Sequence, residues 1–328
     1  MKAFSPLRDS SGPSAAVEIA STRVSGASVE WRGGRPVIAA HAIELLPAGA
    51  LVSSLTAANV VDRVAVAGAV SRVLERIGRP RRIALVVPDP VAKVSFVKFE
   101  RVAPGAQDLG NLIRWQVRKT APFAIEDAQV SYMPGQTTPE GQEFVVTLAR
   151  RDLIEEYESL CAGTGAHPGI VDLATFNVVN AVLAGTPGAL SGDWLLVNVA
   201  PDYVSLAILR GPHLIFFRNR VAETDGTVAD LVHQTAMYYE DRLSGGGFVR
   251  VLLAGASGGG DRHLGEVELV RRSLEARLEA TVDTVDPRAA VTLTDRISAG
   301  PALLDTLAPL VGILLRGQES EKPGENVA

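Results

Sequence analysis

Two distant segments of this chain follow the same order of strands and turns, and this internal duplication constrains the fold more than any other feature. The segments begin at Ala15, with AAVEIASTRVSGASVEWRGGRPVIAAHAIEL, and at Trp194, with WLLVNVAPDYVSLAILRGPHLIFFRNRVAE. Each predicts three consecutive strands, with an Arg-Gly turn between the second and the third. The sequence therefore predicts two structurally similar halves.

A helix and then a buried strand are predicted after each of these three-stranded units. Apolar residues recur at helical spacing from Ala57 to Ile77 and from Thr227 to Leu243. The segments RIALVV, at 82–87, and VRVLLA, at 249–254, are apolar almost throughout, as expected for strands covered on both faces. Two halves of this kind, each a mixed sheet with helices, are the plan of the actin-like α/β fold.

An additional segment separates the two halves and predicts a small α+β subdomain. Its expected elements are the strand VSFVKF from Val94, a helix from Asp108 to Thr120, the strands AQVSYM and EFVVTLA, and a helix from Asp152 to Ala162. The expected organisation is a first half over 15–190 with an insertion at about 94–165, and a second half over 191–317. The polar ends, 1–14 and 318–328, are expected to be disordered tails.

Composition and charge exclude several classes of function. Basic residues number 32 against 37 acidic ones, a net charge of -5 that argues against nucleic acid as the main partner. The single cysteine, Cys161, cannot form an internal disulfide, so a reducing compartment and a cytoplasmic location are expected. The apolar stretch from Ala302 to Leu315 is shorter than the roughly 20 residues of a membrane span, so none is expected.

Common catalytic and nucleotide-binding motifs are missing from the sequence. No lysine follows a glycine, which excludes a P-loop, and the glycine-rich run at 255–260 has the wrong spacing for a dinucleotide turn. The five histidines have no cysteine or carboxylate at ligand spacing, and no G-x-S-x-G motif is present. Neither a catalytic nucleophile nor a metal site is therefore expected.

The middle of the insertion, NLIRWQVRKTAPFAIEDAQVSYMPG, combines a Trp-bearing helix, an x-Pro-Phe break, an acidic pair and a strand with Tyr. In this it resembles the family of PilM, the type IV pilus assembly protein. Three further segments resemble the same family: ARRDLIEEYESLCAGTGAHPGIVDLATFNVVNAV, the second three-stranded unit with LIFFRNR, and the closing LAPLVGILLRG. The resemblance covers about residues 15 to 317.

The resemblance implies a cytoplasmic scaffold with an actin-like fold, held under the inner membrane by protein partners. Its partner would be the N-terminal peptide of PilN, a membrane protein of the pilus assembly complex. Type II secretion L proteins share the fold and the insertion, but they continue into a membrane span that this sequence does not include.

The resemblance to actin-like ATPases also identifies a candidate nucleotide site. Those ATPases hold phosphate on two turns reading Asp-x-Gly-[Ser/Thr], in which glycine lets backbone amides approach and aspartate serves Mg²⁺. The first turn here comprises Glu18, Ala20, Ser21 and Thr22. It keeps a carboxylate and hydroxyls but places a methyl group at Ala20.

The second turn has changed further, with Asn198, Ala200, Pro201 and Asp202. Asn198 lacks the charge directed at Mg²⁺, and Pro201 lacks an N–H donor. A third turn, Gly255-Ala256-Ser257, matches the adenosine side of the fold in position. The sequence thus predicts a vestigial nucleotide site with no catalytic residue, at which binding of ATP with Mg²⁺ stays open.

Three interpretations of function remain from the sequence. A scaffold needs no nucleotide chemistry and is favoured. A nucleotide-dependent switch in a pilus or type II secretion machine would use bound ATP to bias closure of the two halves. A sugar-kinase-like transferase would need a catalytic base and intact phosphate turns, and neither is visible in the sequence.

The partner peptide is expected at the insertion, near Val94, Phe96, Trp115 and Tyr132. On the helix from Asp108 to Thr120, the apolar stripe leaves Trp115 roughly 135° from its centre. Trp115 is therefore expected off the core face, either at its rim or as an anchor for a peptide. The groove is expected between this helix, the strand from Val94 and the strand ending at Tyr132.

Overall fold

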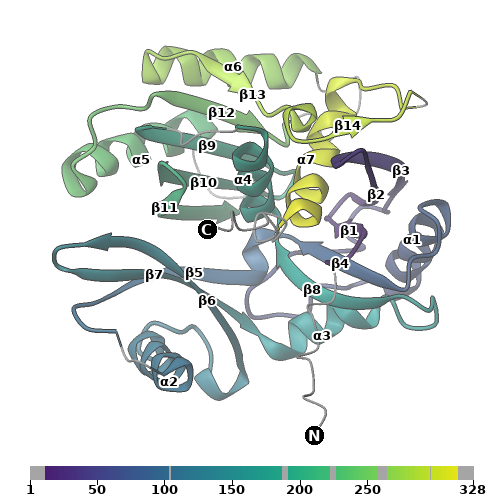
Figure 1. Cartoon of the computed structure of the whole chain (residues 1–328), viewed down its shortest axis with the longest axis horizontal. Helices are drawn as coiled ribbons and strands as arrows, with labels where there is room; N and C mark the ends of the chain where they lie inside the picture. The colour runs from purple at the N-terminus through teal and green to yellow at the C-terminus, as the bar shows by residue number, and fades with distance from the viewer. Residues whose placement is uncertain are drawn as a thin grey trace, which may run out of the picture.

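Two large β-sheets, one in each half, and one small sheet form the frame of the protein (Figure 1). The computed structural model describes residues 12–102, 105–186, 191–221, 227–256, 264–295 and 297–316. The first sheet has the order β14-β3-β2-β1-β4-β8, the second β11-β10-β9-β12-β13, and the small sheet β5-β7-β6.

The strands of the first sheet are β1 (Ala15–Ile19), β2 (Arg23–Arg32), β3 (Arg35–Leu45), β4 (Arg82–Val87), β8 (His167–Leu173) and β14 (Thr292–Leu293). Those of the second are β9 (Asp193–Val199), β10 (Tyr203–Arg210), β11 (His213–Val221), β12 (Arg250–Ala254) and β13 (Val282–Thr284). The small sheet contains β5 (Ala92–Phe99), β6 (Ala128–Thr138) and β7 (Gly141–Arg150). The helices are α1 (Arg63–Arg76), α2 (Ala106–Val117), α3 (Arg151–Ser159), α4 (Ala174–Gly185), α5 (Val228–Leu243), α6 (Leu264–Leu278) and α7 (Pro301–Leu315).

The two large sheets repeat one topology, which confirms the predicted duplication. In each, three antiparallel strands are followed by a fourth that runs parallel to the first, as β4 does beside β1 and β12 beside β9. The first hairpins also share an equivalent hydrogen bond, because Ala20 N–H donates to the carbonyl of Arg23 and Ala200 N–H to that of Tyr203, both at 2.9 Å. The two halves therefore place their first turns equivalently.

The two strands predicted to be covered on both faces, β4 and β12, are buried on both faces in the structure. Along β4, Ile83 and Leu85 pack in the core against α1, whereas Ala84 and Val86 pack in the core against α7. In the second half, the strands face α5 and α6 on one side and α4 on the other. Helices α4 and α7 thus lie between the two large sheets (Figure 1).

The end of the described chain returns to the first half. Strand β14 pairs with β3 at the edge of the first sheet, and α7 packs against that sheet and α4. The sequence pattern had assigned residues 191–317 together to the second half, because local patterns do not show which sheet a returning segment joins. The strongly apolar sequence of α7 reflects burial between the sheets, and in the described part of the chain no helix is long and apolar enough to span a membrane.

The small sheet packs α2 on one face and turns the other toward β11 (Figure 1). Helix α3, which the sequence grouped with the insertion, instead packs in the core of the first half through Tyr157, Leu160 and the buried Cys161 beyond its end. By packing, the insertion ends near Arg150, where β7 ends.

Capping residues set where two of the helices begin. Helix α1 begins only at Arg63, because the Asp62 carboxylate accepts a hydrogen bond from Ala65 N–H. The helical pattern predicted from Ala57 was therefore too long, and Val64 is 85% exposed. Helix α5 follows a capping box formed by Thr227 and Asp230, in agreement with its predicted start.

Gly312 provides a test of the contact between α4 and α7. A Cβ atom there would lie 1.7 Å from the carbonyl oxygen of Asn177, so Gly312→Ala forces the helices apart. We expect a loss of about 3 kcal/mol or more in the free energy of unfolding, measured by urea denaturation.

Gly68→Ala in α1 is the matched control, since its nearest neighbour is only the flexible end of Arg72. It replaces glycine in a helix interior without a clash and should leave stability unchanged or raise it by about 0.5–1 kcal/mol. Equal effects of the two variants would show that close helix approach is not required.

Candidate functional site

The three turns singled out in the sequence meet at the boundary between the two halves. Ser21 Oγ, in the first turn, donates a hydrogen bond of 2.9 Å to Asp202 Oδ1 in the second. Gly255, with φ of +77°, lies so close to the second turn that a Cβ would be 2.7 Å from Asn198 Oδ1. Ser257 lies outside the described residues, so the structure places Gly255 and Ala256 of the third turn.

The carboxylate of the first turn is engaged within its own half. Glu18 is buried and accepts hydrogen bonds from Arg23 Nη2 at 3.2 Å and Ser25 Oγ at 2.9 Å. The arginine compensates the negative charge, as a buried carboxylate requires. Glu18 is therefore neutralised by the protein and is not available as a free Mg²⁺-directed group.

The second turn offers few groups that could hold a phosphate. The amide of Asn198 donates from Nδ2 to Thr175 Oγ1 at 2.8 Å, and Pro201 has no N–H to donate. Asp202 adds a negative charge at the contact with the first turn. Compared with the turns of actin-like ATPases, the second turn thus offers one N–H donor fewer to a phosphate, and its carboxylate, Asp202, is engaged by Ser21.

A buried acid that the sequence pattern missed lies beside these turns. Asp89, directly after β4, is fully buried and accepts hydrogen bonds from Thr175 N–H at 3.0 Å, from the Thr175 hydroxyl, and from Ser205 Oγ at 2.5 Å. Asn219 Nδ2 in turn donates to Ser205 Oγ at 2.9 Å. Because Thr175 belongs to α4 and Ser205 to β10, the acid links the two halves.

Burial raises the pKa of Asp89 to about 6, because removal from water disfavours its charged form more than its hydrogen bonds favour it. Burial also raises the pKa of the neighbouring Tyr203 well above its usual range. The one sequence signal for this group was a lone carboxylate between Pro88 and Pro90 at the end of an apolar strand. That signal gives no indication of the partners, which come from distant segments.

A separate cavity of about 1090 Å³ lies where the insertion meets both halves. Its walls come from β6 and β7 of the small sheet, from α3, β8 and α4, and from the β10–β11 turn. Strands β6 and β8 are each the outermost strand of their sheet, so two strand edges border this space. In the described residues no cluster of side chains suited to a metal is found here or elsewhere.

The lining of the cavity is mainly apolar inside and charged toward α3. Apolar side chains come from Ile154, Phe176, Val179 and Leu183, and charged ones include Arg151, Glu155 and Glu158. Asp172 pairs with Arg316 at 2.5 Å across one wall, and burial raises the pKa of this carboxyl despite the arginine. The cavity thus offers apolar contact with charged groups at fixed places.

The structure separates the four expected partner residues. Val94 and Phe96 pair with Thr147 and Val145, so they share the face of the small sheet that borders the cavity. Tyr132 lies within β6 rather than at its end and pairs with Val146. Its ring stands edge-on to Phe144, with ring centroids 6.1 Å apart, on the face of the small sheet that α2 covers, although the residue also borders the cavity.

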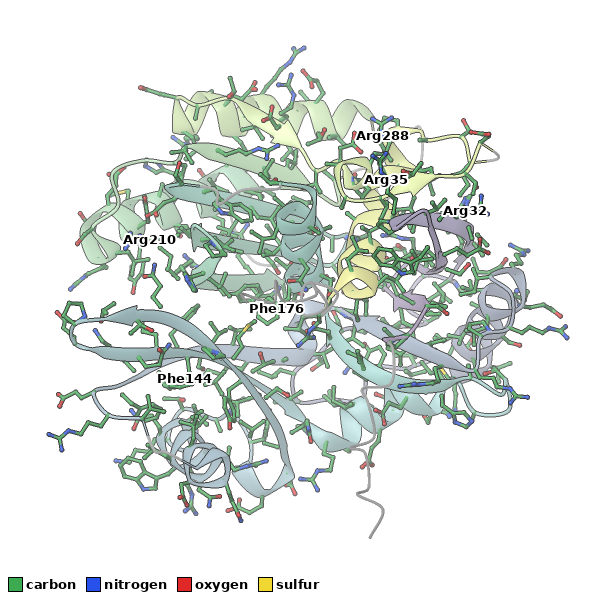
Figure 2. All side chains as sticks on the ribbon, viewed as in Figure 1. Arg32, Arg35, Phe144, Phe176, Arg210 and Arg288 are labelled. Carbon is green, nitrogen blue, oxygen red and sulfur yellow. The ribbon has the colours of Figure 1, made fainter. Side chains whose placement is uncertain are left out.

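Trp115 is 66% exposed on α2, which covers the opposite face of the small sheet. In Figure 2, Phe144 lies on the α2 side of the small sheet and Phe176 on the side of the second half. The predicted position of Trp115 off the core face is confirmed. Helix α2, however, does not line the cavity, so the expected groove between α2 and the strands differs from the cavity that is observed.

Comparison with known proteins gives one family and one close fold. The sequence model of the family described as type IV pilus assembly protein PilM matches residues 16–241. The solved structure of a PilM-PilN type IV pilus biogenesis complex is 18% identical, covering 93% of this chain and 97% of that chain with a TM-score of 0.74. The actin-like α/β fold expected from the sequence is confirmed by this likeness together with the duplicated sheets.

Two more distant structures also match. The cytoplasmic domain of EpsL, an inner membrane component of the type II secretion system of Vibrio cholerae, is 11% identical over 74% of this chain and 81% of that chain, with a TM-score of 0.46. A protein of Bacteroides thetaiotaomicron with an actin-like ATPase fold and unknown function is 8% identical over 86% and 94%, also at 0.46.

Stability as a function of pH tests the assignment of Asp89 as a buried acid. Its pKa is higher in the folded protein, about 6, than the ordinary 3.8, so the folded state binds the proton more tightly than the unfolded chain. The stability that this group contributes is present below pH 4 and is lost as pH rises toward about 6.

We expect the free energy of unfolding of the wild type, relative to Asp89→Asn, to fall by about 2 to 3 kcal/mol between pH 4 and pH 7. Denaturant titrations across this pH range measure the difference in the free energy of unfolding. The contributions of the neighbouring Asp172 and Tyr203 cancel in this difference, because both proteins contain them. A difference that does not change with pH would contradict the assignment.

Proposed function

We propose, from the premise that the chain belongs to the family of the type IV pilus assembly protein PilM, that it is a scaffold that binds the N-terminal peptide of a PilN-like membrane protein. The family match runs from β1 through the insertion to β11 and most of α5. The related solved structure is a complex of a PilM protein with PilN, which supports a partner of that kind.

The cavity between the insertion and the two halves is the observation that carries this proposal. It is bordered by the outermost strands β6 and β8, and such edges pair with added extended segments through their backbone groups. An extended peptide laid there would alternate its side chains between the small sheet and the first half. We therefore place the peptide in this cavity.

The size and lining of the cavity support binding of several apolar side chains. At about 1090 Å³ it is slightly larger than the range of roughly 300–1,000 Å³ in which small-molecule pockets bury most of their ligand. Side chains such as Ile154 and Phe176 supply apolar contact, and Glu155 and Glu158 lie where basic groups of a peptide would be stabilised. The peptide expected here has apolar residues next to Lys or Arg.

Charge supports the same partner. Membrane proteins carry an excess of Lys and Arg in short segments on the cytoplasmic side, and this chain has a net charge of -5. Electrostatic attraction between the two raises the rate of encounter. The proposed scaffold would thus be located at the inner membrane through its partner, with no turnover of nucleotide.

Met133→Asp tests the cavity. Met133 is 49% exposed, lies on β6 and faces the cavity beside Val145. Because the side chain is half exposed, the protein should fold with a carboxylate there, but the carboxylate would disrupt apolar contact with a peptide. We expect affinity for a fluorescein-labelled N-terminal peptide of the PilN-like protein to fall about tenfold or more, by fluorescence anisotropy.

Trp115→Ala is the matched control, because Trp115 is an exposed apolar side chain on the opposite side of the same sheet. It should leave both affinity and melting temperature unchanged. A loss of affinity in Trp115→Ala with none in Met133→Asp would move the site to α2, and no binding of the peptide by the wild type would refute the scaffold function.

We also expect no release of phosphate from millimolar Mg-ATP above a control without protein. The reason is the missing charge at Asn198, the missing donor at Pro201 and the engagement of Glu18 by Arg23. A coupled phosphate assay measures this. Turnover by the wild type that Asn198→Ala abolishes would favour the nucleotide-dependent switch instead.

A further inference from the structure

We infer that Asp202 is a built-in anion that ties the first turns of the two halves together, so that closure of the halves does not depend on a bound nucleotide. Asp202 Oδ1 accepts a hydrogen bond from Ser21 Oγ at 2.9 Å, and Oδ2 accepts one from Ser53 Oγ at 2.5 Å. Both hydroxyls belong to the first half and the carboxylate to the second. One side chain therefore bridges segments 181 and 149 residues away in sequence.

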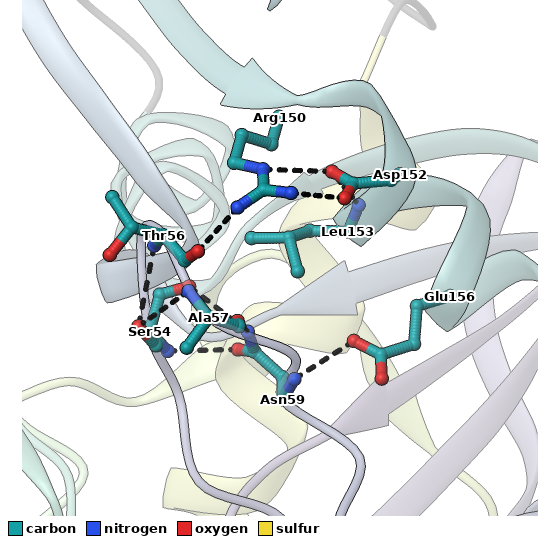
Figure 3. Close-up of polar contacts among 8 residues, drawn as sticks. All are labelled: Ser54, Thr56, Ala57, Asn59, Arg150, Asp152, Leu153 and Glu156. Atoms are coloured by element: carbon teal, nitrogen blue, oxygen red, sulfur yellow. Dashed lines mark hydrogen bonds and ion pairs between the residues drawn. The ribbon is translucent and has the colours of Figure 1, made fainter. Parts of the chain in front are cut away.

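Hydrogen bonds hold in place the loop that directly follows Ser53 (Figure 3). The buried Asn59 accepts from Ser54 N–H at 2.9 Å and donates from Nδ2 to the carbonyls of Ser54 at 3.0 Å and Ala57 at 2.8 Å. The Asn59 N–H donates to Glu156 Oε2 of α3 at 2.9 Å, and Arg150 binds the carbonyl of Thr56. Ser54, the residue next to Ser53, is thus held by contacts within the first half that do not involve Asp202.

The first turn contains more donors than its own half satisfies. Among the described residues, Thr22 Oγ1 and Arg23 Nε are buried without a hydrogen-bond partner, and these are the first and second residues after Ser21. A buried turn with unpaired donors favours an anion. The carboxylate of Asp202 brings a negative charge to the neighbouring Ser21, although neither Thr22 Oγ1 nor Arg23 Nε is hydrogen-bonded to it.

The repeat of the hairpins shows that this carboxylate is an addition to the second turn. Ala20 and Ala200 occupy equivalent positions, as their matching hydrogen bonds show, so Asp202 corresponds to Thr22. The first half thus has a neutral side chain, Thr22, where the second half has the carboxylate of Asp202, which contacts the first half. A phosphate at the same place would be repelled by this charge.

A second set of contacts supports closure without a ligand. Asp89 of the first half accepts from Ser205 of the second, and Asn198 of the second donates to Thr175 of α4. These groups are buried, so each hydrogen bond would be lost without replacement if the halves separated only slightly. The protein's own side chains therefore make the contacts that hold the halves together.

The test measures the distance between the halves in the full chain. Val64→Cys on α1 and Leu269→Cys on α6 place spin labels on exposed positions of the two halves, at 85% and 68% exposure. The native Cys161 stays unlabelled because it is buried, which raises the pKa of its thiol to about 11. Pulsed electron paramagnetic resonance then gives the distribution of distances with and without millimolar Mg-ATP or Mg-pyrophosphate.

We expect one narrow distribution for the wild type, unchanged by either ligand. Asp202→Ala should give longer and broader distances, and its affinity for Mg-pyrophosphate should rise about tenfold or more, because a repelling charge is removed and the hydroxyls of Ser21 and Ser53 are released. Asp202→Asn is the matched control, since its amide oxygen accepts from one hydroxyl while its Nδ2 donates to the other, and it should keep distances close to those of the wild type.

Two results would overturn the inference: distances in Asp202→Ala equal to those of the wild type, or distances in the wild type that shorten on addition of Mg-ATP. If Asp202→Ala does not fold, Ser53→Ala is the second variant. It removes one of the two hydrogen bonds to Asp202 without changing the turns themselves, and it should broaden the distribution of distances between the halves. An unchanged distribution in Ser53→Ala would then count against the inference. Peptide binding plays no part in these measurements, so they are independent of the proposed scaffold function.

Discussion

The close packing of α4 against α7 is the contact on which the rest of the structure depends. Glycine at position 312 allows it, because a Cβ atom there would lie only 1.7 Å from the carbonyl oxygen of Asn177. These two helices form the layer between the large sheets, and α4 also carries Thr175 to the turns and Phe176 to the cavity. The packing of one pair of helices therefore sets the geometry of both candidate sites.

Polar contacts between the protein's own side chains cross the boundary between the halves. The half-buried carboxylate of Asp202 accepts hydrogen bonds from Ser21 and Ser53. A second, fully buried network joins Asp89 to Thr175 and Ser205. Buried polar groups stabilise a structure only when each has its partner, so such a network defines one arrangement of the halves. A fixed arrangement suits a scaffold, which has to present one surface continuously.

The cavity depends on three units at once, which explains why no single sequence segment indicates it. The small sheet gives the outermost strand β6, the first half gives β8 and α3, and the second half gives the β10–β11 turn. Helix α3 links the two candidate sites, since Glu156 on one side holds the loop before α1 and Ile154 on the other faces the cavity. Its membership of the first-half core makes this link rigid.

The sequence alone determined the duplicated halves, the doubly covered strands and the altered chemistry of the turns, because apolar periodicity, side-chain charge and a missing N–H are local properties. It also identified Trp115 as lying off the core face of its helix. Only the tertiary structure decided that Asp202 meets Ser21 and Ser53, that Asp89 is buried between the halves, and that the cavity lies on the side of the small sheet away from α2. These contacts join residues far apart in the chain, and their distances are set by the packing of whole sheets and helices, which no local pattern encodes.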